Sequence, residues 1–336
     1  MKFTENKKQE IIYYLLNKIN QQDKEISKTV AENFEINQNT VHTYINELVK
    51  KNVITRIKRG EYELNQTTHT YKLSRKKGDL DSDTYAYSQY FYPHIENLSD
   101  NVKSIWAYSF TEMTNNIIDH SMSDNATIVV KQDYLSTTVF LADDGIGIFK
   151  KIKEHFKLAT LDEAICELFK GKLTTDHTNH SGEGIFFTSK MMDYFYILSS
   201  EKIFTNNKYD NSTILDSEAV NIKGTCVIMS LSNYSNKDPK EIFDLYANDD
   251  GNFTKTRIPI KNIFETSPVS RSQAKRVCNR LEKFKEIILD FESVPWIGQG
   301  FAHQIFVVFA NANPDITLIP INMNEDVTKM YNHVIG

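Results

Sequence analysis

The sequence is short of cysteine and has no long apolar run, and each shortage excludes a class of protein. Its three cysteines, Cys166, Cys226 and Cys278, lie 60 and 52 residues apart, which excludes a zinc knuckle or a disulfide framework and is typical of the reducing cytoplasm. The longest apolar run, residues 305–310, falls far short of the roughly 18 residues that a membrane-spanning helix needs. The first ten residues contain no apolar segment of the kind found in signal peptides. We therefore expect a cytoplasmic protein with no membrane attachment.

Charge is distributed unevenly along the 336 residues. Residues 1–77 carry 15 Lys and Arg against 9 Asp and Glu, a formal charge of +6, whereas the remainder carries 24 against 35, or −11. A basic segment on an acidic body indicates nucleic acid binding at one end only. Polar stretches near 65–84 and 234–252 divide the chain. We predict domains over 1–65, 85–235 and 253–336, with a linker over 66–84.

The N-terminal segment has the pattern of three helices and a hairpin. Apolar residues recur at helical spacing from Ile11 to Ile19, a short helix is expected over 26–34, and Asn39 and Thr40 are expected to cap a third. The buried face of this third helix is predicted to hold Val41, Ile45, Leu48 and Val49. Apolar and polar residues then alternate over 53–55 and 62–64, on either side of a basic tip, which predicts a hairpin.

Three helices and a basic hairpin resemble the winged helix-turn-helix family, in which the third helix enters the major groove and the wing contacts phosphate. The exposed polar side chains of the third helix are of the kind that contact base edges. The residues expected to contact DNA are Asn39, Thr40, His42, Thr43, Arg56, Lys58 and Arg59. A winged helix used only for dimerisation or peptide binding is the alternative.

The middle segment is expected to open with a long helix over 101–121 that carries two different faces. Trp106, Phe110, Met113 and Ile117 form an apolar stripe. The opposite face gathers a carboxylate, two amides, an acid and an imidazole: Glu112, Asn115, Asn116, Asp119 and His120. By itself such a face could be simply solvated.

Three glycine motifs follow this helix. A predicted strand over 137–142 leads into residues 143–147, Asp-Asp-Gly-Ile-Gly, where a carboxylate could accept a hydrogen bond from an exocyclic amine such as that of adenine. Residues 181–187 place two glycines before a helix, and the N-terminus of a helix attracts phosphate. Gly224 and Thr225 open a last strand.

In this order and spacing the motifs resemble the GHKL ATP-binding superfamily of gyrase, histidine kinases, chaperones and anti-sigma-factor kinases, over about 85–232. The resemblance implies an α/β-sandwich Bergerat fold that binds ATP and Mg²⁺. It makes Glu112 the general base, Asn116 the Mg²⁺ ligand and Asp143 the adenine ligand. It assigns the remaining nucleotide contacts to Gly145, Gly147, Gly182, Gly184 and Thr225.

The same resemblance implies an ATP lid over about 149–181. Candidate γ-phosphate contacts in the lid are Lys170, Lys172, Thr174, Thr175, Asn179 and His180. A sensor histidine kinase is not expected, because residues 66–100 are too short and irregular for the dimerising hairpin that carries the phosphoacceptor histidine.

Beyond residue 253 the expected strands and helices alternate, which indicates a small parallel sheet with crossover helices. We predict strands over 253–264, 286–291 and 316–321, and helices from about Ser270, over 299–310 and over 325–333. Residues 270–276 and 296–301 resemble DUF4325, the STAS-like module found after GHKL ATPases. Arg271, Lys275 and Arg276 are either an anion site or a solvated face.

Anti-sigma-factor kinases, which share the GHKL fold, phosphorylate a serine on a STAS-domain partner protein. That serine lies in a turn between a strand and a helix, and the resemblance matches this turn to residues 294–301 here. Gly298, Gln299 and Gly300 offer no hydroxyl in this turn, so the tail is not expected to be a phosphoacceptor there.

Together these patterns predict a multidomain protein of α+β and α/β type: a winged helix, a Bergerat domain and a STAS-like domain. We interpret it as a homodimeric, cytoplasmic transcription regulator that couples Mg-ATP binding or hydrolysis to DNA, or to a protein partner at the STAS-like domain. A Ser/Thr kinase acting on a STAS-type partner, and an ATP-sensing transcription factor without turnover, are the alternatives.

Overall fold

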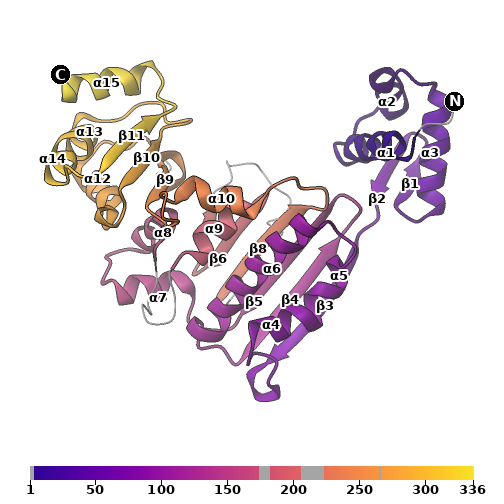
Figure 1. Cartoon of the computed structure of the whole chain (residues 1–336), viewed down its shortest axis with the longest axis horizontal. Coiled ribbons are helices and arrows are strands. Elements are labelled where there is room, and N and C mark those ends of the chain that lie inside the picture. Colours follow the sequence, from indigo (N-terminus) through magenta and orange to yellow (C-terminus); the bar gives the residue numbers. More distant parts are fainter. Residues whose placement is uncertain (1–3, 174–181, 206–222, 265) are drawn as a thin grey trace.

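A computed structural model describes residues 4–173, 182–205, 223–264 and 266–336 of the chain. The chain forms three parts in a row, and its two ends lie at opposite extremes of the molecule (Figure 1). The mixed α/β, multidomain architecture expected from the sequence is confirmed. Within the described ranges no helix is both long and apolar enough to cross a membrane.

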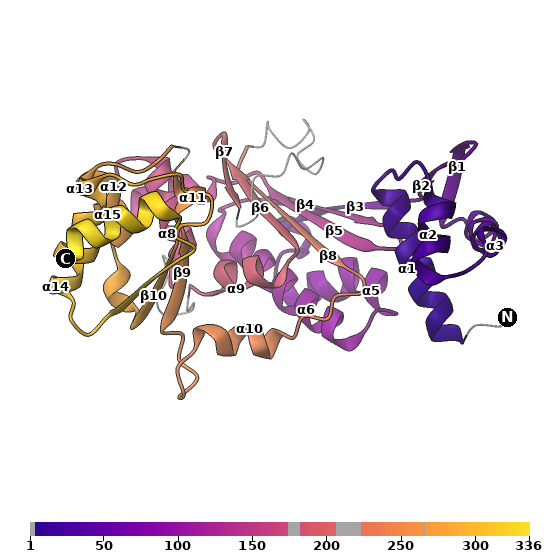
Figure 2. The same cartoon turned by 90° about the horizontal axis from the view of Figure 1, so that it is seen from above.

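The N-terminal head contains the three predicted helices and the hairpin, at the end of the molecule away from the small C-terminal sheet (Figure 2). Its elements are α1 (Glu5–Asn20), α2 (Ile26–Phe34), α3 (Gln38–Lys50), β1 (Ile54–Lys58) and β2 (Glu61–Leu64). The helix α3 begins earlier than predicted, because Asn37 is the N-cap and its side chain accepts a hydrogen bond of 2.8 Å from the Asn39 N–H. Tyr44 is buried on this helix, whereas Val49, predicted to be buried, is 37% exposed.

The segment predicted to be a linker, 66–84, instead contains a strand of the central sheet. Strand β3 (Thr67–Ser74) pairs antiparallel with β4 (Asn125–Gln132) along its whole length. The sequence of β3 is polar because β3 is an edge strand, with most of its side chains exposed. An inner strand would show alternating apolar residues, whereas β3 is held in the sheet by its backbone hydrogen bonds to β4.

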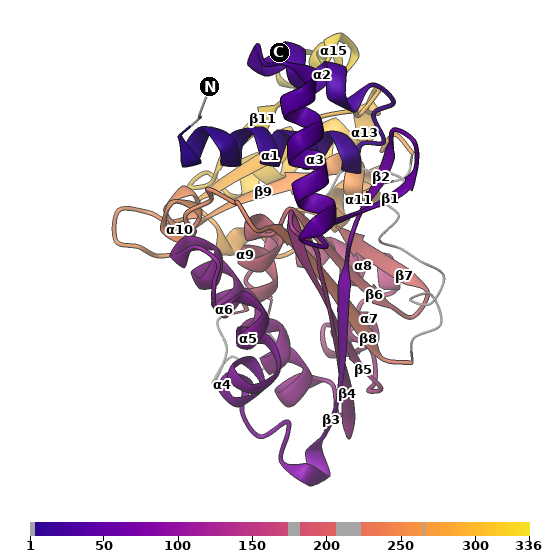
Figure 3. The ribbon, with the colours of Figure 1, turned by 90° about the vertical axis from the view of Figure 1, so that its right-hand side faces the viewer.

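The central sheet has six antiparallel strands in the order β3-β4-β5-β8-β6-β7. The further strands are β5 (Ser136–Asp143), β6 (Tyr194–Ser199), β7 (Lys202–Thr205) and β8 (Thr225–Ser232). One face is covered by α4 (Asp83–Ala86), α5 (Tyr92–Ile95), α6 (Asp100–Asn115) and α9 (Gly184–Met191), as Figure 3 shows. Aromatic packing joins α6 to the segment before α5, since Phe91 stacks on Phe110 with ring centroids 4.8 Å apart.

The C-terminal sheet is parallel, as predicted, with the strand order β11-β10-β9. Its elements are β9 (Lys255–Pro259), α11 (Ile260–Ile263), α12 (Arg271–Cys278), β10 (Glu286–Asp290), α13 (Gln299–His303), α14 (Ala310–Ala312), β11 (Thr317–Ile321) and α15 (Glu325–Ile335). Ser270 and Gln273 form a capping box that starts α12. The strand predicted over 253–264 is shorter, because the chain turns into α11 directly after Pro259.

The central and C-terminal parts share one hydrophobic core, whereas the head has a core of its own. Phe253 packs on Phe186 at 4.9 Å and on Phe284 at 5.5 Å between ring centroids, so one aromatic cluster joins α9 to the C-terminal sheet. Helices α7 (Ile148–His155), α8 (Leu161–Lys170) and α10 (Pro239–Tyr246) lie around this junction (Figures 1 and 2). The head is anchored differently: Leu135, in the turn between β4 and β5, belongs to the core of the head.

Candidate functional site

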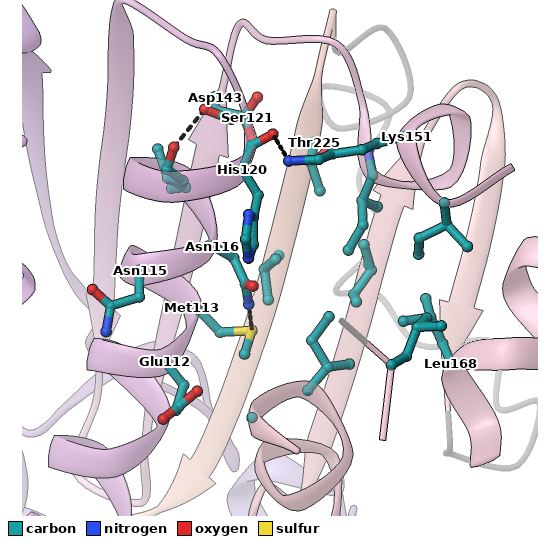
Figure 4. Close-up of a pocket in the computed structure, with 18 of the residues that line it drawn as sticks. Glu112, Met113, Asn115, Asn116, His120, Ser121, Asp143, Lys151, Leu168 and Thr225 are labelled. Atoms are coloured by element: carbon teal, nitrogen blue, oxygen red, sulfur yellow. Dashed lines mark hydrogen bonds between the residues drawn. The ribbon is translucent and has the colours of Figure 1, made fainter. Parts of the chain in front are cut away.

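A cavity of about 330 Å³ lies between the sheet, α6, α7 and the start of α9. It is lined by residues from widely separated stretches of the chain (Figure 4). Seven of the residues assigned to the nucleotide site line it: Glu112, Asn116, Asp143, Gly147, Gly182, Gly184 and Thr225. Apolar side chains complete the walls, among them Leu141, Ile197 and Val227. The cavity thus combines apolar walls with a small set of polar groups, as small-molecule sites do.

The polar face of α6 is divided by the structure into side chains at the cavity and side chains elsewhere. Glu112, Asn116 and His120 line one side of the cavity, where α6 continues into a π-helical turn over residues 116–120. Asn115 also lines the cavity, but its amide donates a hydrogen bond of 3.2 Å to Asp83 on α4. Because this amide is already engaged within the protein, Asn116 is the better candidate to meet a ligand.

Helix α9 packs directly on the carboxylate of Glu112. A Cβ atom at Gly184 would overlap the Oε2 atom of Glu112, so only glycine permits this close approach. The first N–H groups of a helix have no partner within the helix and carry the positive end of its dipole. This start of α9 opens on the cavity through Gly182, Gly184 and Ile185, and it is the group in the site best suited to an anion.

Asp143 is a buried carboxylate at the end of β5, and only 7% of it is exposed. Its Oδ1 atom accepts a hydrogen bond of 2.8 Å from the Gly145 N–H. Burial raises the pKa of Asp143 to about 6, although hydrogen bonds from the backbone of Gly145 and Thr225 oppose this rise. The Oγ1 atom of Thr225 accepts a hydrogen bond of 3.0 Å from the Ile148 N–H and so holds the start of α7 against β8.

Gly145 does not itself line the cavity, although it was predicted as a nucleotide contact. A Cβ atom at Gly145 would overlap the carbonyl oxygen of Ser121 and approach Asp143 Oδ1 to 2.9 Å. The glycine is therefore required so that the loop after β5 can pack against the end of α6, which orients the carboxylate of Asp143.

The structure corrects the prediction for the lysines near the end of α8. The Nζ atom of Lys172 donates to the carbonyl of Lys283 at 3.2 Å and lies over the rings of Phe253 and Phe284. Lys170 is 1% exposed and donates to backbone carbonyls at the end of α12. Both side chains face the C-terminal domain, whereas their neighbours Leu168, Gly171 and Leu173 line the cavity. The remaining lid candidates, Thr174, Thr175, Asn179 and His180, lie outside the described residues.

Sequence analysis missed Lys151, which lines the cavity from α7. Its Nζ atom donates a hydrogen bond of 2.9 Å to the carbonyl of His120 (Figure 4). This contact links the end of the polar helix face to the segment after Gly147. The position of Lys151, one helical turn after the second glycine of the 143–147 motif, was the available signal.

The candidate DNA surface lies at the free end of the head, where α3 and the β1–β2 hairpin are found (Figure 2). Asn39, His42 and Thr43 on α3 are exposed, and Thr40 is half-buried. On the wing, Arg56 donates to the hydroxyl of Tyr62 at 3.1 Å, and Lys58 pairs with Glu61 at 2.8 Å. Arg59 occupies the tip between the two strands and is exposed.

Two segments of the chain are similar to known families. Residues 6–80 match the penicillinase repressor family, and residues 273–328 match the STAS-like domain of unknown function DUF4325. The first match supports a winged-helix, DNA-binding head, and the second confirms the STAS-like character predicted for the C-terminal domain. No curated protein matches the chain. Neither match covers the cavity, so the resemblance of residues 85–232 to GHKL ATPases stays a prediction.

Proposed function

We propose that this protein is a DNA-binding regulator whose central domain binds ATP with Mg²⁺, and that the bound nucleotide controls the activity of the head. The observation that carries the proposal is the cavity itself. It joins a buried carboxylate, the amide of Asn116 and a glycine-opened helix start, three groups that lie far apart in the sequence. A ligand with a hydrogen-bonding ring at one end and phosphates at the other matches this distribution.

The chemistry of the residues fits both ends of such a ligand. Asp143 accepts a hydrogen bond from the exocyclic amine of adenine, between apolar walls that suit a purine. The start of α9 provides backbone N–H groups for phosphate oxygens. Glu112 and Glu183 lie near this end and contribute to the raised pKa of Tyr108, after the larger effect of burial. Because carboxylates repel phosphates, a polyphosphate bound here needs a cation.

Asn116 is the residue that would hold Mg²⁺, through its amide oxygen. This ion typically keeps several waters and binds substrate phosphates with few protein ligands, and when bound it neutralises phosphate charge. Glu112 lies against Gly184 at the start of α9, and in this proposal its carboxylate accepts a proton from a water molecule. ATP hydrolysis is therefore the enzymatic activity that we propose, with ATP sensing without turnover and protein-serine phosphorylation as the alternatives that a phosphate-release assay and labelled ATP would distinguish.

Calorimetry with ATP and Mg²⁺ tests the proposal through Asp143→Asn. The amide can turn its NH₂ toward the adenine amine, so a charged hydrogen bond worth about 1.5–3 kcal/mol is lost and affinity falls roughly 10–150-fold. Asp144→Asn is the matched control, since Asp144 is exposed and accepts hydrogen bonds from the side chains of Ser123 and Asn125 outside the cavity. Equal ATP affinity in the two variants would refute the adenine assignment.

A further inference from the structure

The last turn of α8 and the residues after it have one side on the cavity and the other on the C-terminal domain. Leu168, Gly171 and Leu173 line the cavity. Next to them in the sequence, Glu167, Lys170 and Lys172 contact residues 276–283 of the C-terminal domain. A single short segment therefore separates the proposed ligand from that domain.

The interface is built on buried charges. Glu167 and Lys170 are 3% and 1% exposed, and their side chains pair at 2.7 Å. Across the domain boundary, Arg280 lies 3.3 Å from the other carboxylate oxygen, and the amide of Asn279 donates to Glu167 at 3.0 Å. A buried charge is tolerated only while its partners stay in place. The arrangement therefore allows α8 and residues 279–280 little freedom to move independently.

Lys170 also closes the end of a helix in the C-terminal domain. Its Nζ atom donates to the carbonyls of Arg276 at 3.0 Å and Asn279 at 2.6 Å, where α12 ends. A cation at this position satisfies carbonyls that lack helical partners and matches the negative end of the helix dipole. In return, Thr256 on β9 donates a hydrogen bond of 2.7 Å to the Lys170 carbonyl. We call Glu167, Lys170, Thr256, Asn279 and Arg280 the α8 clamp.

The cavity side of the segment is tied to the start of α9. The Leu173 N–H donates a hydrogen bond of 3.0 Å to the carbonyl of Gly182, which lines the cavity beside Gly184. Phe186 on α9 packs on Phe253, which in turn packs on Phe284. A shift at residues 182–186 therefore reaches the C-terminal domain by two routes, one through α8 and one through the aromatic cluster.

We propose that the α8 clamp couples occupancy of the cavity to the end of α12, so that the C-terminal domain senses whether a ligand is bound. Packed interfaces of this kind move between discrete arrangements and do not deform continuously. The identity of the ligand as ATP rests on the proposed function. The coupling between residues 182–186 and 276–283 does not, because it is a property of the protein's own packing and hydrogen bonds.

Hydrogen exchange of the full-length protein, followed by mass spectrometry, tests the coupling in two ways. In the wild-type protein, saturation with ATP and Mg²⁺ should slow exchange over residues 271–283. Without any ligand, Asn279→Ala/Arg280→Met should speed exchange over residues 182–188 roughly tenfold, as removal of a charge-assisted hydrogen bond does for local opening. Lys329→Met is the control, because Lys329 is a 73% exposed member of an ion pair in the same domain.

The outcomes separate the coupling from the proposed function. Unchanged exchange at 182–188 in the double variant, relative to Lys329→Met, would overturn the coupling, as would ATP binding that leaves 271–283 unaffected. Absence of ATP binding to the wild-type protein would refute the proposed function, while the comparison of unliganded variants would still decide the coupling. If the double variant does not fold, Arg280→Lys replaces it. This variant keeps the charge on a shorter side chain, and it should raise exchange at 182–188 by a smaller factor.

Discussion

At the scale of single residues, Asp143 combines its proposed role in ligand binding with a cost to folding. Its carboxylate is almost fully buried, and hydrogen bonds from two backbone N–H groups only partly compensate for the loss of water. An acid whose pKa is higher in the folded than in the unfolded protein stabilises the fold while it is protonated. That stabilisation is complete below pH about 4 and is lost as the pH rises through about 6.

Asp143→Asn should therefore alter how stability depends on pH. The amide does not ionise, so the free energy of unfolding of the variant minus that of the wild-type protein should increase between pH 4 and pH 7. From a pKa raised from 3.8 to about 6, the increase over this interval is roughly 2–3 kcal/mol. Urea unfolding at four pH values measures it. Hydrogen bonds from Ser123 and Asn125 lower the pKa of Asp144, so the difference for Asp144→Asn should change in the opposite direction, below about pH 4, and stay nearly flat between pH 4 and pH 7. A flat difference for Asp143→Asn would contradict the buried, raised pKa.

Glu112 and Asn116 lie on the same helix face, but replacing them should affect different steps, turnover for Glu112 and Mg²⁺-dependent binding for Asn116. Glu112→Gln should keep ATP affinity and lose turnover by roughly 10²–10⁴-fold, because a general base acts in the transition state. Asn116→Ala should instead weaken binding only when Mg²⁺ is present. Calorimetry with and without Mg²⁺, together with phosphate release, distinguishes the two. Wild-type hydrolysis rates in both variants would mean that this face of α6 takes no part in catalysis.

At the scale of elements, we expect the wing to contribute charge to DNA recognition and α3 to contribute hydrogen bonds. The triple variant Arg56→Ala/Lys58→Ala/Arg59→Ala should reduce the slope of log affinity against log salt by roughly 0.9 for each phosphate that the wing no longer neutralises. Because Lys58 already pairs with Glu61, we expect the two arginines to account for most of the change. Fluorescence anisotropy with a duplex of mixed sequence measures the slope for the full-length protein.

The control for the wing variant removes three positive charges at positions outside the head. Lys240, Lys285 and Lys329 are exposed and lie outside the head, so their triple replacement by Ala changes the net charge equally. If that variant flattens the salt slope as much as the wing variant, binding depends on overall charge and the wing has no special role. No retention of duplex by the wild-type protein at low salt would favour a protein-binding head.

At the scale of the whole molecule, Leu135 and Tyr234 connect the central sheet to the head. Leu135 is 7% exposed and belongs to the core of the head, although it lies in the turn between β4 and β5. Beside it, the ring of Tyr234 packs on Tyr13 at 5.0 Å and on Tyr134 at 5.8 Å between centroids. If nucleotide state is to reach the head, this small interface is a direct path between the central sheet and the DNA surface.

Leu135→Ala should weaken the contact between the head and the central sheet without altering the cavity. Large-to-small core replacements cost about 2–5 kcal/mol, and the loss should appear as earlier melting of the head, with ATP affinity unchanged. Any effect of ATP on DNA affinity should also shrink. Ile203→Ala on β7, where the side chain is 46% exposed, is the matched control. Nucleotide-dependent DNA binding that survives Leu135→Ala would show that the signal takes another path.

Light scattering on the same samples would test the expected homodimer.

Much of the fold follows from local patterns in the sequence, because helices and strands with one buried face repeat apolar residues at their own period. The spacing of Ile11 to Ile19 gave α1, and the alternation of β and α segments after residue 253 gave the parallel sheet. Residues of the cavity were predicted differently, from the resemblance that the polar helix face and the glycine motifs together bear to GHKL ATPases. Seven of the residues so assigned line one cavity.

Only the tertiary structure decided which neighbour each long or polar side chain meets. Lys170 and Lys172 were candidate γ-phosphate contacts because the GHKL resemblance implies a lid over 149–181, yet both contact the C-terminal domain. Strand β3 has too little apolar character to be recognised, since its partner β4 supplies the hydrogen bonds that define it. Charge and hydrogen bonding depend on what lies within a few ångströms, and interactions between residues more than 100 positions apart leave no periodic trace in the sequence.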